Sequence, residues 1–107
     1  MKEIKAYIKK HKLDAVMSAL RKIDGLSGVS ILNSSGFGAG WRSTAGGNER
    51  NPGVKIELVC REALVDEVVS TIEKSAHTGL KGDGKIYVSA IEQAVRISTG
   101  ERGETAA

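Results

Sequence analysis

The sequence predicts an α+β domain of the ferredoxin-like class, a four-stranded antiparallel sheet with two helices on one face. Four segments alternate apolar and polar residues as strands do, and two repeat apolar residues at helical spacing. Their order along the chain is β-α-β-β-α-β. With 107 residues, 40% of them hydrophobic, the chain is long enough to bury one core, and we assign residues 1–107 to a single domain.

The strands are identified by alternation, which places every second side chain on the same face of a sheet. We expect strands at residues 3–8, within 27–35, at 54–58 and from 86 to 90. In the second of them, Val29 and Ile31 are expected to point inward. An apolar pattern continues through Val95 and Ile97, and the polar tail 99–107 is expected to be mobile.

The helices are identified by apolar residues three or four positions apart. The first contains Leu13, Val16, Met17, Leu20 and Ile23, and Gly25 is expected to end it. The second contains Leu64, Val65, Val68, Val69, Ile72 and Ala76. Because both helices cover one face of the sheet, the other face carries Tyr7, Val59 and Tyr87 among polar residues. That face is either solvated or covered by another subunit.

Composition excludes several classes of protein. A single cysteine, Cys60, excludes an internal disulfide, and with only two histidines it excludes a zinc finger, so no metal site is expected. We interpret Cys60 as a small buried hydrophobe and His77 as a C-terminal cap of the second helix. The apolar runs are too short to span a membrane, and residues 1–5 do not resemble a signal peptide, which favours a cytoplasmic protein.

The first glycine cluster interrupts the pattern of strands and helices. Residues 36–53 contain six of the thirteen glycines and the only proline. A loop of this length is usually functional, although a solvated connector has the same composition. Trp41, Arg42 and Arg50 lie in it, and an aromatic residue with arginines on a loop is typical of a partner-binding anchor.

The second glycine cluster, residues 78–85, nearly matches a phosphate-binding Walker A loop. The match fails because Ile86 stands where a serine or threonine is required, and because this loop leads from a helix into a strand. Successive glycines let backbone amides face a phosphate, and Lys81 and Lys85 add positive charge. An Asp-Gly turn at Asp83 would explain part of the same pattern, so both interpretations stay open.

Residues 78–88 resemble the C-terminal signature of the PII family of nitrogen-regulatory signal proteins, with Tyr87 where phenylalanine or tryptophan is more usual. Gly36-Phe37-Gly38 before the long loop and Val95-Arg96-Ile97 near the end support the resemblance. It covers nearly the whole chain outside the loop interior.

The resemblance implies a homotrimer that binds ATP or ADP in clefts between subunits and is not an enzyme. Residues 36–53 are similar to the T-loop, which docks onto a regulated transporter or enzyme. A transporter partner would bring the cytoplasmic protein transiently to the membrane. Residues 78–85 are similar to the phosphate-binding B-loop, and 98–107 form the C-terminal loop and tail. The residues that would bind the nucleotide are Tyr7, Ser30, Gly38, Glu57, Val59, Gly82, Asp83, Gly84, Lys85 and Arg96.

The chain departs from the family at several positions. Gly40 replaces a glutamine that helps to hold magnesium and 2-oxoglutarate, and Gly53 replaces a lysine that meets the 2-oxoglutarate carboxylate. Ser98 replaces a second C-terminal arginine, and the long loop has no tyrosine for uridylylation. The resemblance therefore implies nucleotide binding, with magnesium allowed, and weak or absent 2-oxoglutarate binding. It leaves open the partner, the preference between ATP and ADP, and modification of Ser43 or Thr44.

Two other classes of function share parts of this pattern. An RNA-binding RRM has the same element order, but it stacks bases on aromatic side chains of its central strands, and residues 54–60 contain none. We expect a solvated face rather than an RNA track from the N-terminal lysines, which are Lys2, Lys5, Lys9, Lys10 and Lys12. A small nucleotide-hydrolysing enzyme is the other alternative, although no nucleophile has a base at a recognisable spacing.

Overall fold

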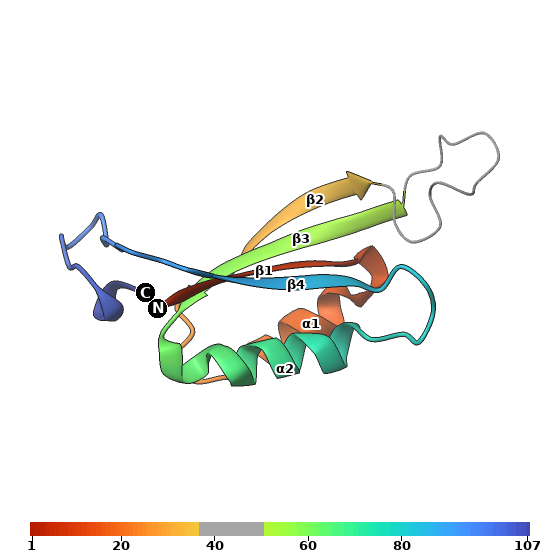
Figure 1. Cartoon of the computed structure of the whole chain (residues 1–107), viewed down its shortest axis with the longest axis horizontal. Coiled ribbons are helices and arrows are strands. Elements are labelled where there is room, and N and C mark those ends of the chain that lie inside the picture. Colours follow the sequence, from red (N-terminus) through yellow and green to blue (C-terminus); the bar gives the residue numbers. More distant parts are fainter. Residues whose placement is uncertain (37–50) are drawn as a thin grey trace.

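The computed structural model describes residues 1–36 and 51–107. The elements are β1 (Lys2–Lys9), α1 (Leu13–Leu20), β2 (Ser30–Gly36), β3 (Asn51–Cys60), α2 (Val65–Ala76) and β4 (Gly84–Ala90) (Figure 1). Short 3-10 turns at Lys10–Lys12 and Glu62–Leu64 lead into the two helices, and a further one covers Glu104–Ala106. The β-α-β-β-α-β order expected from the sequence is confirmed.

The four strands form one antiparallel sheet in the order β2-β3-β1-β4. In the register of the central strand, Ile4 lies opposite Leu58 on one side and Val88 on the other. Both helices pack on the same face of the sheet, as expected (Figure 1). None of the helices in the two described segments has the length and apolar character needed to span a bilayer.

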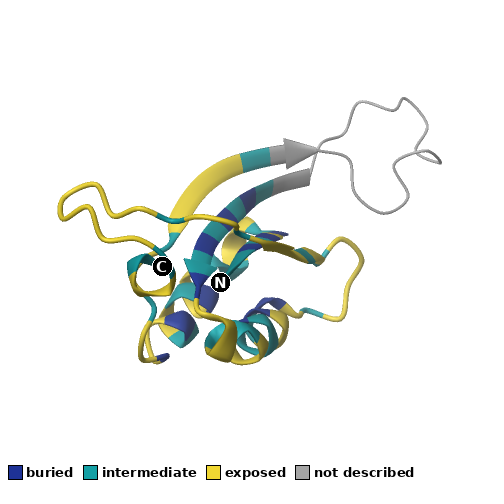
Figure 2. Ribbon diagram, turned by 60° about the vertical axis from the view of Figure 1, so that its left-hand side comes forward, coloured by how far each residue is buried: buried dark blue, intermediate teal, exposed yellow. Residues whose placement is uncertain are grey.

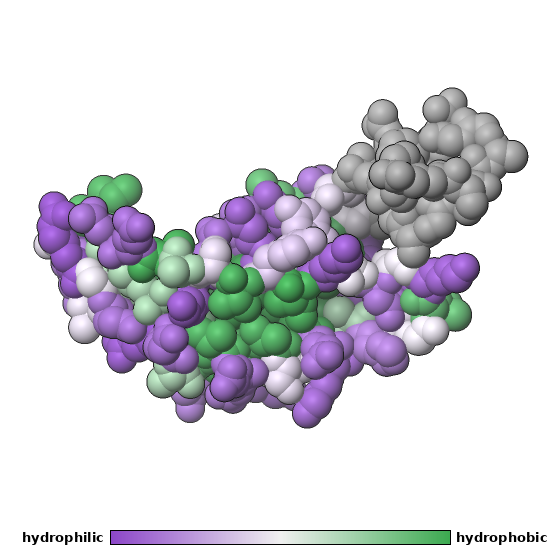
Figure 3. Space-filling model, in the orientation of Figure 1, coloured by the Kyte–Doolittle hydropathy of each residue, from purple (hydrophilic) through white to green (hydrophobic). Residues whose placement is uncertain are grey.

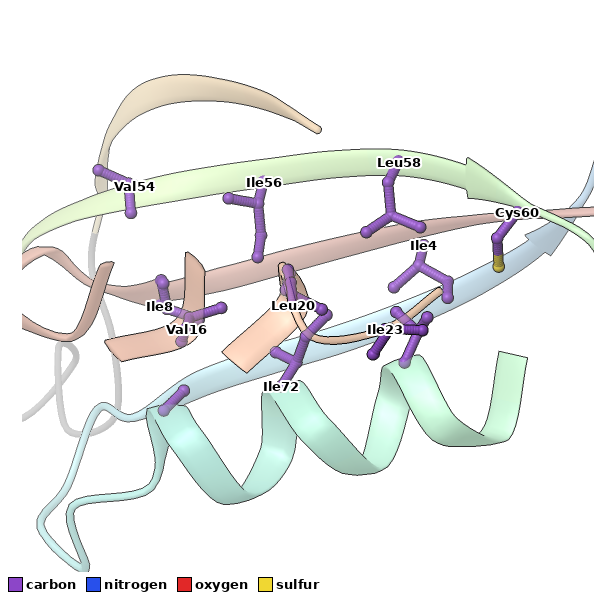
Figure 4. Close-up of a cluster of buried hydrophobic side chains, with 13 residues drawn as sticks. Ile4, Ile8, Val16, Leu20, Ile23, Val54, Ile56, Leu58, Cys60 and Ile72 are labelled. Atoms are coloured by element: carbon purple, nitrogen blue, oxygen red, sulfur yellow. The ribbon is translucent and has the colours of Figure 1, made fainter. Parts of the chain in front are cut away.

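The core lies between that face and the helices. Along β3, buried residues alternate with half-buried ones, the pattern of a strand with one covered face (Figure 2). The buried residues are Ile4, Ala6, Ile8, Val16, Leu20, Ile23, Val54, Ile56, Leu58, Cys60, Val68, Ile72 and Ala76 (Figure 4). Cys60 is buried at the end of β3, which confirms its interpretation as a small hydrophobe. Ile72 and Ala76 anchor the last turns of α2, the helix that directly precedes the second glycine cluster.

Two details differ from the expectation. Ile31 lies opposite Ile56, hence on the helix-facing side, yet 46% of it is exposed because β2 is the edge strand. The first helix ends at Leu20, and the chain continues in turns to Ile23, whose amide donates to the carbonyl of Leu20 over 3.0 Å. Gly25 then adopts φ +95°, a left-handed conformation that ends the turns rather than the helix.

The C-terminal residues form a turn, where the sequence led us to expect a mobile tail. The amide of Gly103 donates to the carbonyl of Ala94 over 3.0 Å, and that of Arg96 donates to Glu101 over 2.8 Å. The carboxylate of Glu104 accepts a hydrogen bond from the amino group of Met1 over 3.1 Å. Composition alone did not reveal this turn because its hydrogen bonds are made by the backbone.

Candidate functional site

The loop between α2 and β4 contains three glycines in the left-handed region. The φ angles are +82° at Gly79, +82° at Gly82 and +105° at Gly84. At Gly84 a side chain is also sterically impossible, since a Cβ atom there would lie 1.6 Å from the carbonyl oxygen of Tyr7 on β1. The glycines therefore set the path of the loop and its approach to the sheet.

The carboxylate of Asp83 holds the two ends of this loop together. It accepts hydrogen bonds from the amide of Thr78 over 2.8 Å, from the amide of Gly79 over 3.2 Å, and from the Thr78 hydroxyl. The ammonium of Lys9 lies 3.1 Å from Asp83 Oδ1 and donates to Thr78 Oγ1 over 3.2 Å. One side chain thereby joins two residues that lie five positions apart in the sequence.

These contacts keep Asp83 ionised. Hydrogen bonds from the hydroxyl and amide of Thr78, then from Lys9 and the amide of Gly79, hold the pKa of the Asp83 carboxyl far below its usual range. The carboxylate faces the loop itself, so the side chain shapes the loop, and only the backbone around it is available to an anion.

The same loop presents positive charge outward. Lys81 and Lys85 are exposed, whereas Lys9 is half-buried against Asp83. Lys85 lies opposite Tyr7 in the sheet register, on the face that the helices leave open. Backbone amides at left-handed glycines beside exposed lysines are the arrangement that binds phosphate oxygens.

A hollow of about 400 Å³ adjoins the loop. Its walls include Val69, Ile72 and Ala76 of α2, with Gly84 and Ile86 of β4. Figure 3 shows apolar side chains gathered between these two elements. The loop therefore stands at the border between an apolar surface and a charged one.

Besides Lys85, the open face of the sheet carries four further expected site residues. Tyr7 packs edge-on against Tyr87, with ring centroids 6.2 Å apart. Glu57 pairs with Lys55 over 2.8 Å, which lowers the pKa of the Glu57 carboxyl and raises the pKa of the Lys55 ammonium. Ser30 lies directly opposite Glu57. The fourth residue, Val59, lies two positions further along β3, opposite Glu3.

Arg96 lies at the other end of the sheet. The seven residues of β4 carry the chain away from Gly84, a path of roughly 20 Å at the usual rise of a strand (Figure 1). Arg96 there pairs with Glu101, Nε to Oε1, over 3.4 Å. One chain thus brings Gly82, Asp83, Gly84 and Lys85 together but leaves Arg96 apart from them.

The sequence was compared with family models and with known proteins. The family model described as "Nitrogen regulatory protein P-II" matches residues 1–101. The chain belongs to the PII family. It is 49% identical to the nitrogen regulatory protein P-II of Rhodospirillum rubrum over 109 residues, which cover 96% of each chain. It is 43% identical to that of Azospirillum brasilense over the same share, and 45% identical to that of Rhodobacter capsulatus over 99% of each chain.

PII membership confirms the family expected from residues 78–88, and with it a regulatory protein rather than an enzyme. The RRM and hydrolase alternatives receive no support from these comparisons. Four expected residues, Gly38, Trp41, Arg42 and Arg50, lie outside the described residues. Among the residues that are described, no group of three histidine, cysteine or carboxylate side chains could hold a metal ion.

Sequence reasoning missed Lys9. The sequence predicts that Lys9 belongs to a solvated face, but its side chain is only 21% exposed and contacts Asp83 and Thr78. His77 is likewise more than the expected helix cap, because its Nδ1 lies 3.6 Å from Asp83 Oδ2. The available signal was the place of Lys9 at the end of the first strand, where a glycine loop of another strand can reach it.

Proposed function

We propose that this PII protein binds ATP and ADP through the loop that precedes β4. The observation that carries the proposal is the geometry of residues 78–85, three left-handed glycines held in place by Asp83 with Lys85 exposed beside them. The phosphates would be held by the backbone from Gly82 to Gly84 and by the Lys85 ammonium.

The nucleotide would bind between copies of the chain in a homotrimer. Arg96 lies at the far end of its own sheet, so it serves a phosphate only by reaching the loop of a neighbouring copy. The open sheet face offers two partly exposed aromatic rings for such contacts, since Tyr7 is 38% and Tyr87 52% exposed. Glu57, Val59, Tyr7 and Ser30 on this face would meet the adenine.

The output would pass through residues 36–53 to a regulated transporter or enzyme in the cytoplasm or at the membrane. The name shared by the relatives, nitrogen regulatory protein, supports a regulated partner. Trp41, Arg42 and Arg50 are the side chains we assign to that contact. Trp41→Ala should keep ATP affinity and abolish partner binding, and the fluorescence of this single tryptophan should shift when ATP is added to the wild type.

Binding of 2-oxoglutarate would be weak or absent, with magnesium still allowed beside the nucleotide. At Gly53 a Cβ atom would lie 2.9 Å from the carbonyl oxygen of Ile8, so the backbone of β1 occupies the space that a longer side chain needs. Two carboxylates without cationic partners do not recover their desolvation cost. Micromolar binding that depends on magnesium and ATP would contradict this part of the proposal.

Isothermal titration with ATP and ADP tests the site, and light scattering tests the assembly. Lys85→Ala should weaken ATP binding about tenfold, the worth of one charged hydrogen bond. The wild type should scatter as three times the chain mass of 11.3 kDa. Unchanged ATP affinity in Lys85→Ala contradicts the site, and a monomeric mass at micromolar concentration contradicts the assembly.

A further inference from the structure

The side chain of Lys9, at the end of β1, reaches the loop before β4. Its ammonium bridges two loop residues, lying 3.1 Å from Asp83 Oδ1 and 3.2 Å from Thr78 Oγ1. Thr78 lies 69 positions and Asp83 lies 74 positions from Lys9 in the sequence. Both members of the ion pair are half-buried, with 21% of the Lys9 side chain and 24% of the Asp83 side chain exposed. Such a pair is screened by solvent much less than an exposed one.

The loop that we propose for phosphate binding contains a carboxylate at its centre. An uncompensated negative charge at Asp83 would repel a polyphosphate beside Gly82 and Gly84, and the repulsion would grow with the charge of the ligand. The residues that face this carboxylate are Lys9, Thr78, the amide of Gly79, and His77, whose Nδ1 lies 3.6 Å away. The His77 side chain is 71% exposed, whereas Lys9 is held against the carboxylate.

We propose that Lys9 is a positioning residue for nucleotide binding, which neutralises Asp83 and fixes the Asp83–Thr78 closure so that the loop accepts a polyphosphate. The inference rests on the proposed function and adds a residue from another strand to it. Lys9 does this without touching the ligand. Its charge is used inside the loop, while the exposed Lys81 and Lys85 face outward.

The geometry also explains why the ammonium stays in place. The Thr78 hydroxyl donates to Asp83 and accepts from Lys9, and it accepts a further hydrogen bond from the amide of Leu80 over 3.1 Å. At Gly82, a Cβ atom would lie 3.9 Å from Lys9 Cε, so the lysine stem lies along the loop backbone. Removal of Lys9 therefore leaves a carboxylate facing the loop without its cation.

The test is a charge series of ligands. ATP, ADP, AMP and adenosine are titrated at pH 8 into the wild type, Lys9→Gln and Lys9→Arg, with Lys10→Gln as the control that removes the same charge from an exposed neighbour. Circular dichroism and light scattering establish that each variant keeps its fold and assembly. Lys9→Gln should weaken ATP about tenfold, the scale of one charged interaction, with a smaller loss for each phosphate removed and almost none for adenosine.

Lys9→Arg should recover most of the ATP affinity because it keeps the positive charge, and Lys10→Gln should bind like the wild type. An equal loss for ATP and adenosine would show a merely structural role and would overturn the inference. So would an unchanged ATP affinity in Lys9→Gln. A wild type that binds no ATP would instead contradict the proposed function itself.

A double-mutant cycle separates positioning from direct contact with the ligand. If Lys9 acts by neutralising Asp83, Lys9→Gln should cost clearly less ATP affinity in the Asp83→Asn background than in the wild type. If Lys9 contacts the phosphates itself, its loss should cost the same in both backgrounds. That second result would overturn the inference.

Discussion

The two ends of the sheet carry the two halves of the proposed site, and they are built differently. At one end, Asp83 closes the loop with hydrogen bonds to Thr78 and Gly79 and an ion pair to Lys9 of another strand. At the other end, the turn around Arg96 is held by its own backbone and by one ion pair to Glu101, in which both side chains are 42% exposed.

The difference shows where each half obtains its shape. The loop before β4 is fixed by contacts between distant strands, so one chain suffices to form it. The turn around Arg96 makes its contacts within ten residues, from Ala94 to Gly103. Ile97, the residue after Arg96, is 98% exposed. In our proposal, these exposed groups gain their contacts from a second copy of the chain.

The largest expected effect compares one left-handed glycine at each end. Gly84→Ala should destabilise the fold by about 3 kcal/mol or more, because the new Cβ collides with the carbonyl of Tyr7 and the left-handed conformation adds strain. Gly100→Ala is the matched control. Gly100 also has a positive φ, +73°, but nothing lies within 4 Å of its Cβ position, so only the strain of about 1 kcal/mol is expected.

Urea unfolding at equal protein concentration measures the free energy of unfolding of both variants. Equal losses of stability in Gly84→Ala and Gly100→Ala would mean that the loop before β4 moves away from Tyr7 without cost. The contrast between the two ends would then be wrong.

The next effect concerns the division of the site between copies. Lys85→Ala and Arg96→Ala should each weaken ATP binding about tenfold, since each removes one charged partner of a phosphate. Co-expression of the two variants should restore full affinity at a fraction of the sites, because some clefts then combine an intact Lys85 with an intact Arg96. Titration of the mixed trimers measures that fraction. If no site recovers full affinity, Lys85 and Arg96 of different chains do not combine in one cleft, and the division of the site between copies is wrong.

A third prediction concerns how the stability of the fold depends on pH. The pKa of Asp83 is lowered in the folded protein, so its contribution to stability is complete above the ordinary carboxyl pKa of about 4. The contribution is lost as the pH falls below that value toward the lowered pKa, because the unfolded chain then binds a proton that the folded loop does not. Asp83→Asn should remove this component. The difference in unfolding free energy between wild type and Asp83→Asn, measured from pH 7 to pH 2.5, should shrink as the pH falls, and a constant difference would contradict the role of the carboxylate.

The smallest effect on stability is expected in the turn around Arg96. Glu101→Gln removes the ion pair to Arg96, but exposed pairs are screened by water and contribute little. We expect a change below about 0.5 kcal/mol in the free energy of unfolding. A loss above 1 kcal/mol would show that this turn is as firmly built as the loop before β4.

The sequence was sufficient for the order of elements and for the location of the phosphate-binding candidate. Alternation in β1 and β3, and the helical spacing of Val68, Ile72 and Ala76, are local patterns that determine which side chains share a face. The glycines of 78–85 could be recognised because each serves a backbone conformation that other residues adopt only with strain. The family resemblance rested on the same residues.

Only the tertiary structure decided which charged groups meet. Whether a lysine is solvated or buried depends on what other strands place beside it, and Lys9 finds Asp83 across 74 positions of sequence. The same holds for Ile31, whose apolar side chain fits the strand pattern but lies on an edge that the helices do not cover. Local periodicity fixes the face on which a side chain lies, whereas burial and charge partners depend on which distant segments pack against that face.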